Sequence, residues 1–231
     1  MKYAGFSGIF FMTKEVVLTE DKSPTYYSKQ FDALYHSRHG ALTETNHVFI
    51  KAGLLKLLES KSSIHLLEIG FGTGLNAWAT LKSKSKDSTI HYTALEKFPI
   101  NMDNLMEFKS MLFGEMDDDR GFNDIHEANW NKTVTIQEGF ILQKVEIDFL
   151  DFTTNNSFDL IYFDAFSPEV QPELWTQDFF IHLYKMLSPG GILVTYCAKG
   201  YVKRNLKAAG FVVEPLPGPP GKREMTRALK L

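Results

Sequence analysis

The feature that most constrains this chain is a short turn in which glycine recurs at every second position. Glu68 is followed by Gly70, Gly72 and Gly74, and an apolar segment, residues 64–69, leads into the turn. Glycine lets a backbone turn tightly and approach a ligand closely. The helix expected after the turn offers free N–H groups at its start. The turn therefore predicts a ligand-binding loop between a strand and a helix.

Apolar strand-like segments alternate with helical segments along the rest of the chain. This alternation predicts a parallel sheet covered on both faces, with right-handed crossovers. The fold class is therefore α/β, a doubly wound, mostly parallel seven-stranded sheet. The strands are expected at residues 64–69, 89–95, 143–149, 158–163, 191–196, 211–214 and 226–229, and the helices at 75–82, 99–113, 173–185 and 201–209.

The segment before the glycine turn is expected to be an extension, residues 1–60, on a domain of residues 61–231. The extension combines a β-hairpin with helices. Residues 8–12 and 16–19 are rich in β-forming types and predict the hairpin, with residues 13–15 as its turn. Residues 28–60 show apolar positions at helical spacing and are expected to be largely helical. The acidic stretch at 115–129 is expected to be irregular.

The composition excludes several classes of protein. The 231 residues are 44% hydrophobic and 23% charged, which is typical of a globular chain with a real core. A single cysteine, Cys197, excludes an internal disulfide and a multi-cysteine zinc site, and it lies in an apolar run that predicts burial. No metal site is predicted. No apolar stretch reaches the roughly 20 residues of a membrane span, and the start lacks an export signal, so a cytoplasmic protein is expected.

Two kinds of cofactor use such a glycine loop. A dinucleotide loop reads G-x-G-x-x-G with the pyrophosphate on the helix N-terminus. Counted from Gly70 the third glycine is replaced by Leu75, although Gly72 followed by Ala77 fits the looser G-x-G-x-x-A form. An acid at position 68 suits a ligand with an ammonium and a sulfonium better than a pyrophosphate. S-adenosylmethionine is therefore favoured, and a dinucleotide stays open.

Acids also follow three other expected strands, where open α/β sheets bind their ligands. Glu96 can accept hydrogen bonds from both ribose hydroxyls, in either cofactor class. The Glu68-x-Gly70-x-Gly72-x-Gly74 pattern resembles the first motif of class I methyltransferases, and this resemblance implies that Asp151 accepts from an adenine amino group, with Asp148 as its competitor and Phe152 beside it. Asp164 follows a strand that is apolar throughout, so its carboxylate needs a partner such as a substrate ammonium.

Several stretches together resemble one family, the methyltransferase domain of MnmC. The most specific are the Asp164-Ala165-Phe166-Ser167-Pro168 run with Pro172-Glu173-Leu174-Trp175-Thr176, and the Lys222-Arg223-Glu224-Met225 ending. The other matching stretches, in chain order, are 31–37, 40–45 with 48–49, 70–76, 96–99 and 189–191.

The resemblance implies a class I, Rossmann-like methyltransferase that acts on tRNA. Its reaction would be methyl transfer from S-adenosylmethionine to the primary amine of 5-aminomethyl(-2-thio)uridine at the wobble position, in the anticodon region. A FAD-dependent oxidoreductase domain, which fuller family members carry after this part, is not expected in this chain. The resemblance and the loop imply cofactor contacts from Glu68, Gly70, Gly72, Thr73, Gly74, Asn76, Glu96, Lys97, Asp151 and Asp164.

The expected catalytic residue is Asp164, which would orient the amine and accept its proton. Phe166 and Trp175 are expected to frame the extruded base, although Trp175 is about as well explained as a helix residue packed on the sheet. Residues 199–231 carry eight basic side chains against two acids, which predicts phosphate contacts. These contacts are assigned to Lys203, Arg204, Lys222 and Arg223.

Three other functions stay open on the sequence. An aminopropyl transferase or small-amine methyltransferase would also offer acids after the fourth strand. A non-catalytic tRNA- or nucleoside-binding module is the second, and a dinucleotide oxidoreductase is the third. The acids after several strands argue against the binding module, and the basic C-terminal segment argues against a small cationic substrate.

Overall fold

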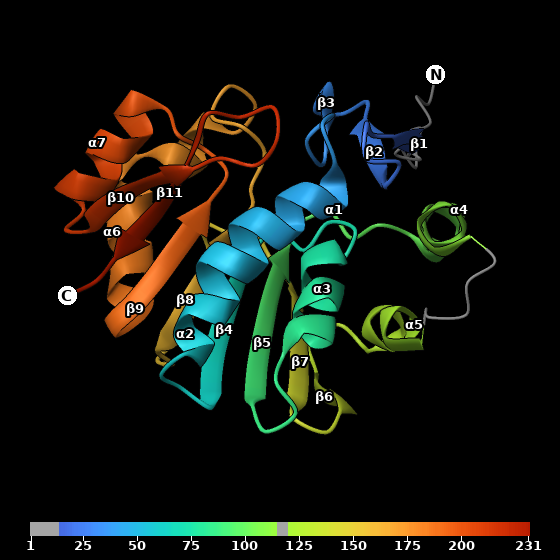
Figure 1. Cartoon of the computed structure of the whole chain (residues 1–231), viewed down its shortest axis with the longest axis horizontal. Helices are drawn as coiled ribbons and strands as arrows, with labels where there is room; N and C mark the ends of the chain where they lie inside the picture. Colours follow the sequence, from blue (N-terminus) through green and yellow to red (C-terminus); the bar gives the residue numbers. More distant parts are fainter. Residues whose placement is uncertain (1–13, 115–119) are drawn as a thin grey trace, which may run out of the picture.

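A computed structural model describes residues 14–114 and 120–231. A large twisted sheet with helices on both faces forms the main body, and a small sheet lies close to the N-terminal end (Figure 1). The strand expected over residues 8–12 lies outside the described residues.

The strands of the main sheet follow the order of a doubly wound fold. They are β4 (Ser63–Ile69), β5 (Thr89–Glu96), β6 (Thr133–Gln137), β7 (Phe140–Glu146), β8 (Phe158–Phe163), β9 (Leu187–Thr195), β10 (Val212–Pro217) and β11 (Glu224–Leu229). Within the described ranges they lie in the order β10-β11-β9-β8-β4-β5-β7-β6. The five central strands, β9 to β7, are parallel, and the pairs at both edges are antiparallel. The mostly parallel sheet is confirmed, but it has eight strands because β6, which was not predicted, pairs with β7.

Helices cover both faces of this sheet (Figure 1). They are α1 (Ala41–Glu44), η1 (Thr45–Leu54), α2 (Leu55–Leu58), α3 (Leu75–Ser83), α4 (Met102–Phe113), α5 (Arg120–Glu127), η2 (Pro172–Trp175), α6 (Gln177–Met186) and α7 (Gly200–Ala208). The segment from α1 to α2 is one continuous helical rod, which packs over β8, β9 and α3. α6 and α7 pack against each other, with α6 against β9.

The core is divided into two clusters by the sheet itself. Successive side chains of a strand point to opposite faces, so Leu66 joins the cluster under the α1–α2 rod and Leu67 joins the cluster under α6. Both residues are fully buried. Strands covered on both faces need apolar residues throughout, which explains the continuous apolar runs in the sequence. Cys197 is buried, as predicted.

The N-terminal sheet differs from the predicted hairpin. It consists of β1 (Lys14–Leu18), β2 (Pro24–Ser28) and β3 (Ala33–Leu34), which pair antiparallel in that order. Lys14 and Glu15 were expected in a turn but belong to β1. The expected helix over 28–60 begins only at Ala41. A separate extension over residues 1–60 stays a prediction.

The stretch expected to be irregular at 115–129 contains α5. Phe122 and Ile125 are spaced three residues apart, so they lie on one helix face, and both are buried. Charged side chains occupy many of the remaining positions, which hid the short apolar face from a reading of composition alone. Across residues 14–114 and 120–231, no helix combines the length and apolar character needed to cross a membrane.

Candidate functional site

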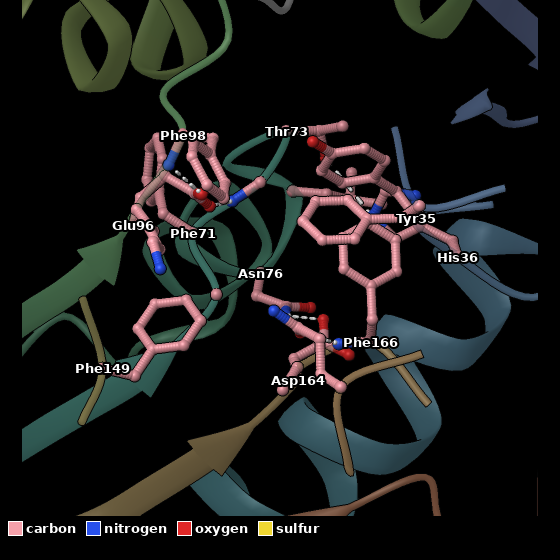
Figure 2. A pocket seen from close by; sticks show the side chains of 17 residues that line it. Tyr35, His36, Phe71, Thr73, Asn76, Glu96, Phe98, Phe149, Asp164 and Phe166 are labelled. Atoms are coloured by element: carbon pink, nitrogen blue, oxygen red, sulfur yellow. Dashed lines mark hydrogen bonds between the residues drawn. The ribbon is translucent and has the colours of Figure 1, made fainter. Parts of the chain in front are cut away.

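A pocket lies at the carboxyl ends of β4, β5 and β8, where the doubly wound fold predicts a ligand. In Figure 2 Asn76 and Asp164 lie together on one side, and Glu96 and Phe98 lie across from them. This cofactor pocket is lined by Phe31, Tyr35, His36, Gly70, Phe71, Gly72, Thr73, Leu75, Asn76, Glu96, Lys97, Phe98, Phe149, Asp164, Ala165, Phe166 and Gln171.

The glycine turn forms the floor of the pocket in a conformation that side chains disfavour. Gly70 has φ +93°, and a Cβ there would lie 2.8 Å from the backbone oxygen of Asp164. Gly72 has φ +50°, and its Cβ would lie 3.1 Å from the ring of Tyr35. Both positions combine a left-handed backbone with a close neighbour, so glycine is required at each. Gly74 begins α3 as its N-cap.

Asp164 is anchored at the end of β8 by a residue of α3. The side-chain amide of Asn76 donates to Oδ2 of Asp164 at 2.8 Å. Thr45 donates from Oγ1 to Oδ1 of Asn76 at 2.9 Å, which fixes the orientation of the amide. Burial raises the pKa of Asp164 well above its usual range, and the nearby Glu44 carboxylate raises it further. The site therefore holds a carboxyl group that binds a proton readily.

Glu68 lies beneath the glycine turn and does not line the pocket. Its side chain is completely buried, and neither carboxylate oxygen has a hydrogen-bond partner among the described residues. Burial raises its pKa well above the usual range. An orphaned carboxyl group is costly, so this position needs either a proton or a ligand that reaches it.

Glu96 supports the glycine loop from the end of β5. Its Oε2 accepts from the backbone N–H of Gly72 at 2.9 Å, and its Oε1 accepts from that of Phe98 at 2.8 Å. Each carboxylate oxygen can accept a second hydrogen bond, so ribose hydroxyls can still be held there. Lys97 lines the same end of the pocket and forms an ion pair with Asp148.

Asp151 was predicted to accept a hydrogen bond from the adenine amino group. It is exposed in the turn after β7 and does not line the pocket. Asp148 is engaged by Lys97 instead. The strand ends at Glu146, three residues earlier than predicted, so the chain has already turned outward at position 151. The adenine contact of Asp151 therefore stays a prediction. The neighbouring Phe149 lines the pocket.

The two aromatic residues assigned to the substrate have different positions. The ring of Phe166 lies in the pocket, 4.7 Å from the centroid of Phe31 and 5.0 Å from that of Tyr35. Trp175 is 1% exposed, packs edge-on against Phe163 and donates from its indole N–H to the backbone oxygen of Phe166. The prediction that Trp175 frames a base is wrong, because its ring belongs to the core. It supports Phe166 from below.

Several pocket residues have no role predicted from the sequence. His36 is held between two hydroxyls, Thr25 at 2.9 Å from Nδ1 and Thr73 at 3.3 Å from Nε2, and burial lowers its pKa to about 4. Tyr35 and His36 lie within the 31–37 stretch that matched the family, so that match was the available signal. The other unassigned lining residues are Phe31, Phe71, Leu75, Phe98, Phe149, Ala165 and Gln171.

A second cavity of about 180 Å³ adjoins the cofactor pocket. We call it the side cavity; it shares Tyr35, His36, Ala165 and Phe166 with the cofactor pocket. Its remaining lining residues are Ala33, Leu34, Ser37, Glu44, Ser167, Tyr196 and Lys222. The side cavity therefore adjoins the part of the cofactor pocket that Ala165 and Phe166 line, next to the partly buried Asp164.

The basic residues of the C-terminal segment fall into two groups. Arg204, Lys207 and Arg223 are exposed, with no ion pair in the described part of the chain. Other cations are engaged within the protein: Lys199 by Glu169, Lys203 by Glu224, Lys222 by Glu44 and Arg227 by Glu214. Of the four predicted phosphate contacts, Arg204 and Arg223 are therefore the ones with free charges.

The residues present fit S-adenosylmethionine. Side chains in place of Gly70 or Gly72 would collide with neighbouring atoms, so the loop leaves its backbone open to a ligand. Glu96 can still accept hydrogen bonds from a ribose. The Glu68 and Asp164 carboxyl groups suit a ligand with two cationic groups. Phe98 and Phe149 offer apolar surface for a purine. A pyrophosphate would meet this acidic set unfavourably, so the dinucleotide alternative loses its support.

Comparison with known proteins agrees with this geometry. Residues 120–231 match a family model described as S-adenosyl-L-methionine-dependent methyltransferase. The tRNA 5-methylaminomethyl-2-thiouridine biosynthesis bifunctional protein MnmC of Cupriavidus metallidurans is 29% identical over 228 residues, which covers 93% of this chain and 33% of the relative. MnmC of Marinomonas sp. is 30% identical, covering 90% of this chain and 32% of the relative. The chain thus spans about a third of the length of the curated relatives it matches.

Solved structures give the same picture. MnmC2 from Aquifex aeolicus superimposes with a TM-score of 0.74 at 25% identity, over 96% of this chain and 72% of that one. Spermidine synthase from Thermotoga maritima has a TM-score of 0.59 at 13% identity, over 98% of this chain and 70% of that one, and shares the fold alone. The chain is therefore similar over most of its length to the methyltransferase part of MnmC, its residues 120–231 match the S-adenosylmethionine-dependent methyltransferases, and its cofactor is S-adenosylmethionine.

Proposed function

We propose that the protein methylates the primary amine of 5-aminomethyl(-2-thio)uridine at the wobble position of tRNA, giving the methylaminomethyl nucleoside. The observation that carries the proposal is Asp164, a partly buried carboxyl group held by Asn76 on the wall of the cofactor pocket, next in sequence to a residue that lines the side cavity. A substrate amine is the partner that such a group favours. The names of the related MnmC proteins point to the same nucleoside.

The chemistry supplied by the bound cofactor is a methyl group on a sulfonium. Transfer forms an N–C bond and breaks a C–S bond, with the electron pair left on sulfur. The amine nitrogen must present a lone pair, so one proton leaves it. Asp164 would accept that proton, since its raised pKa brings it closer to an alkylammonium than an ordinary carboxylate. Asn76 would hold the carboxylate in one orientation throughout.

The base would be framed by aromatic side chains on the open side of the pocket. Phe166 and Phe31 present faces there, and Tyr35 meets Phe166 edge-on. A wobble base has to leave its stack to reach a carboxyl group inside a pocket, and an aromatic surface offsets the loss of stacking. Gln171 fixes the start of this wall, because its Oε1 accepts from the backbone N–H of Phe166 at 3.0 Å.

Contact with the rest of the anticodon region would come from the exposed cations. Arg204, Lys207 and Arg223 are free to meet phosphates. Arg223 lines a surface cavity with Lys199 and Lys222 that borders the side cavity. Bound phosphates near the pocket entrance would hold the wobble nucleotide in register. With a tRNA substrate, the reaction would take place in the cytoplasm.

The decisive experiment is mass spectrometry of tRNA nucleosides. The purified protein is incubated with S-adenosylmethionine carrying a deuterated methyl group and with tRNA bearing 5-aminomethyl-2-thiouridine. We expect the label in 5-methylaminomethyl-2-thiouridine alone. Tight tRNA binding without any label would instead make the protein a binding module. Label appearing only in added putrescine would assign it to small amines.

A further inference from the structure

The side cavity contains a second carboxylate, Glu44, whose contacts resemble a binding site for an ammonium group. Glu44 ends α1 and is 6% exposed. Its Oε2 accepts from the backbone N–H of Ser37 at 3.0 Å, which leaves the carboxylate oriented into the cavity with its other oxygen available. A buried carboxylate needs a cation, so the question is which cation the site suits.

In the structure that cation is Lys222, which reaches in from the loop between β10 and β11. Its Nζ donates to Oε1 of Glu44 and lies 4.5 Å from the ring centroid of Tyr196. A carboxylate on one side and an aromatic face on the other are the two groups that recognise an alkylammonium. The tip of a lysine is itself a primary alkylammonium, the same chemical group as a protonated aminomethyl substituent.

Asp164 lies near enough to Glu44 and Lys222 for the charges of both to act on it. The Glu44 carboxylate raises the pKa of Asp164 and the Lys222 ammonium lowers it, so all three groups act on one another. Two carboxyl groups that share one cation repel each other when it leaves. The region between Glu44 and Asp164 therefore favours replacement of one ammonium by another rather than an empty cavity.

We propose that Glu44 and Tyr196 form the subsite that receives the substrate's protonated amine, and that Lys222 occupies this subsite until the substrate displaces it. The inference rests on the proposed amine substrate. Glu44 would then select a wobble base with a cationic substituent, because the Glu44 carboxylate would repel an anionic carboxymethyl group. It also takes Lys222 out of the set of phosphate contacts in the free enzyme.

The first test measures the small cation alone. Isothermal calorimetry with n-propylammonium chloride should detect binding to Lys222→Met at least tenfold tighter than to the wild-type protein. The double variant Glu44→Gln/Lys222→Met should bind no more tightly than wild type. Arg227→Met is the matched control, since it removes another ion pair of the β10–β11 hairpin, with Glu214. Equal, weak binding to all four proteins contradicts an ammonium subsite.

Stability provides a second measurement if Lys222→Met folds poorly. In this variant Glu44 has no cation beside it, so added n-propylammonium should bind the carboxylate. Binding to the folded state should raise the melting temperature. Tetramethylammonium, which cannot donate a hydrogen bond, should restore less at the same ionic strength. Identical recovery with both salts would reduce the Lys222–Glu44 contact to a structural ion pair.

The kinetic test uses tRNA bearing 5-aminomethyl-2-thiouridine. Lys222→Met should lower the KM for this tRNA severalfold with little change in kcat, because the internal competitor is gone. Glu44→Gln should raise the KM at least tenfold. A KM that rises in Lys222→Met, together with a smaller salt dependence, makes Lys222 a phosphate contact and overturns the inference. No methylation by the wild-type protein would refute the proposed function, while the propylammonium measurements still decide the subsite.

Discussion

The side-chain amide of Asn76 donates a 2.8 Å hydrogen bond to Asp164, and so ties the first turn of α3 to the end of β8. Thr45 of η1 holds the same amide from the other side at 2.9 Å. Three segments that are far apart in the sequence thus meet at one carboxyl group. Such a chain of hydrogen bonds leaves the carboxyl group one orientation, which methyl transfer to a positioned amine requires.

Replacement of Asp164 by Asn should separate chemistry from binding. The new amide keeps an oxygen that accepts from Asn76, so the local geometry survives, but the group can no longer take a proton. We expect kcat to fall by roughly 10²- to 10⁴-fold, the usual contribution of a positioned acid–base group. Affinity for S-adenosylmethionine, measured by calorimetry, should change less than threefold. Turnover at the wild-type rate would remove Asp164 from the mechanism.

The sequence predicts the architecture of this site well because the glycine turn and the apolar strands are local signals. The three-glycine spacing locates the loop, and the acids at 96 and 164 lie at the ends of strands that were predicted to within one residue. The strand before Asp151 was predicted three residues too late, because β7 begins and ends earlier and pairs with the unpredicted β6. The edge strand β6 is short and a tight turn joins it to β7, so this pair gives little periodic signal.

Side-chain contacts across the sheet could not be predicted in the same way. Trp175 lies in a motif that matched the family, but whether its ring faces a ligand or the core depends on α6 and β8 packing together. The Glu44–Lys222 contact joins residues 178 positions apart. No local sequence pattern indicates such a pair. The excess of basic residues in 199–231 led instead to the prediction that Lys222 contacts phosphate.

Glu68→Gln should stabilise the protein without cofactor and weaken the binding of S-adenosylmethionine. Burial raises the pKa of Glu68 in the folded state. Above the ordinary carboxyl pKa the folded chain therefore keeps a proton that the unfolded chain releases, and the free energy of unfolding falls as the pH rises. Gln carries no such cost, and we expect a higher melting temperature than wild type at pH 7.5 with little difference near pH 4. Affinity for S-adenosylmethionine should fall about tenfold, on the scale of one charge-assisted hydrogen bond. Unchanged affinity would exclude Glu68 from the cofactor site.

Substitution of Gly190 and of Gly70 by Ala should distinguish the cost of backbone strain from the cost of a steric collision. Gly190 has φ +76° with nothing near its missing Cβ, whereas Gly70 has φ +93° and a Cβ would strike the backbone oxygen of Asp164 at 2.8 Å. Gly190→Ala should therefore cost only about 1–2 kcal/mol for the left-handed conformation. Gly70→Ala should cost more in urea unfolding and should abolish cofactor binding. Equal destabilisation of the two variants would show that the floor of the pocket tolerates a shift of β8.

Stability should fall in mild acid because the pKa values of two imidazoles are lowered in the folded protein. Burial lowers the pKa of His36 to about 4 and that of His126 to about 3. Between the ordinary histidine pKa and those values the unfolded chain binds protons that the folded chain does not, so the free energy of unfolding rises with pH. Each histidine contributes a slope approaching about 1.4 kcal/mol per pH unit. Urea titrations at about pH 5 and pH 7.5 should show this decrease in stability, and the decrease should be smaller in His36→Gln.

Salt dependence should distinguish the free cations from the engaged ones. Arg204 and Arg223 are exposed without an ion pair in the described residues, whereas Arg227 donates to Glu214 at 2.7 Å. Removal of one phosphate-binding side chain should lower the slope of log affinity against log salt by about 1. Arg204→Ala and Arg223→Ala should each weaken tRNA binding and flatten the slope in fluorescence titrations. Arg227→Ala should lower the melting temperature and leave the slope unchanged. A slope that none of the three substitutions alters would place the RNA on another face of the protein.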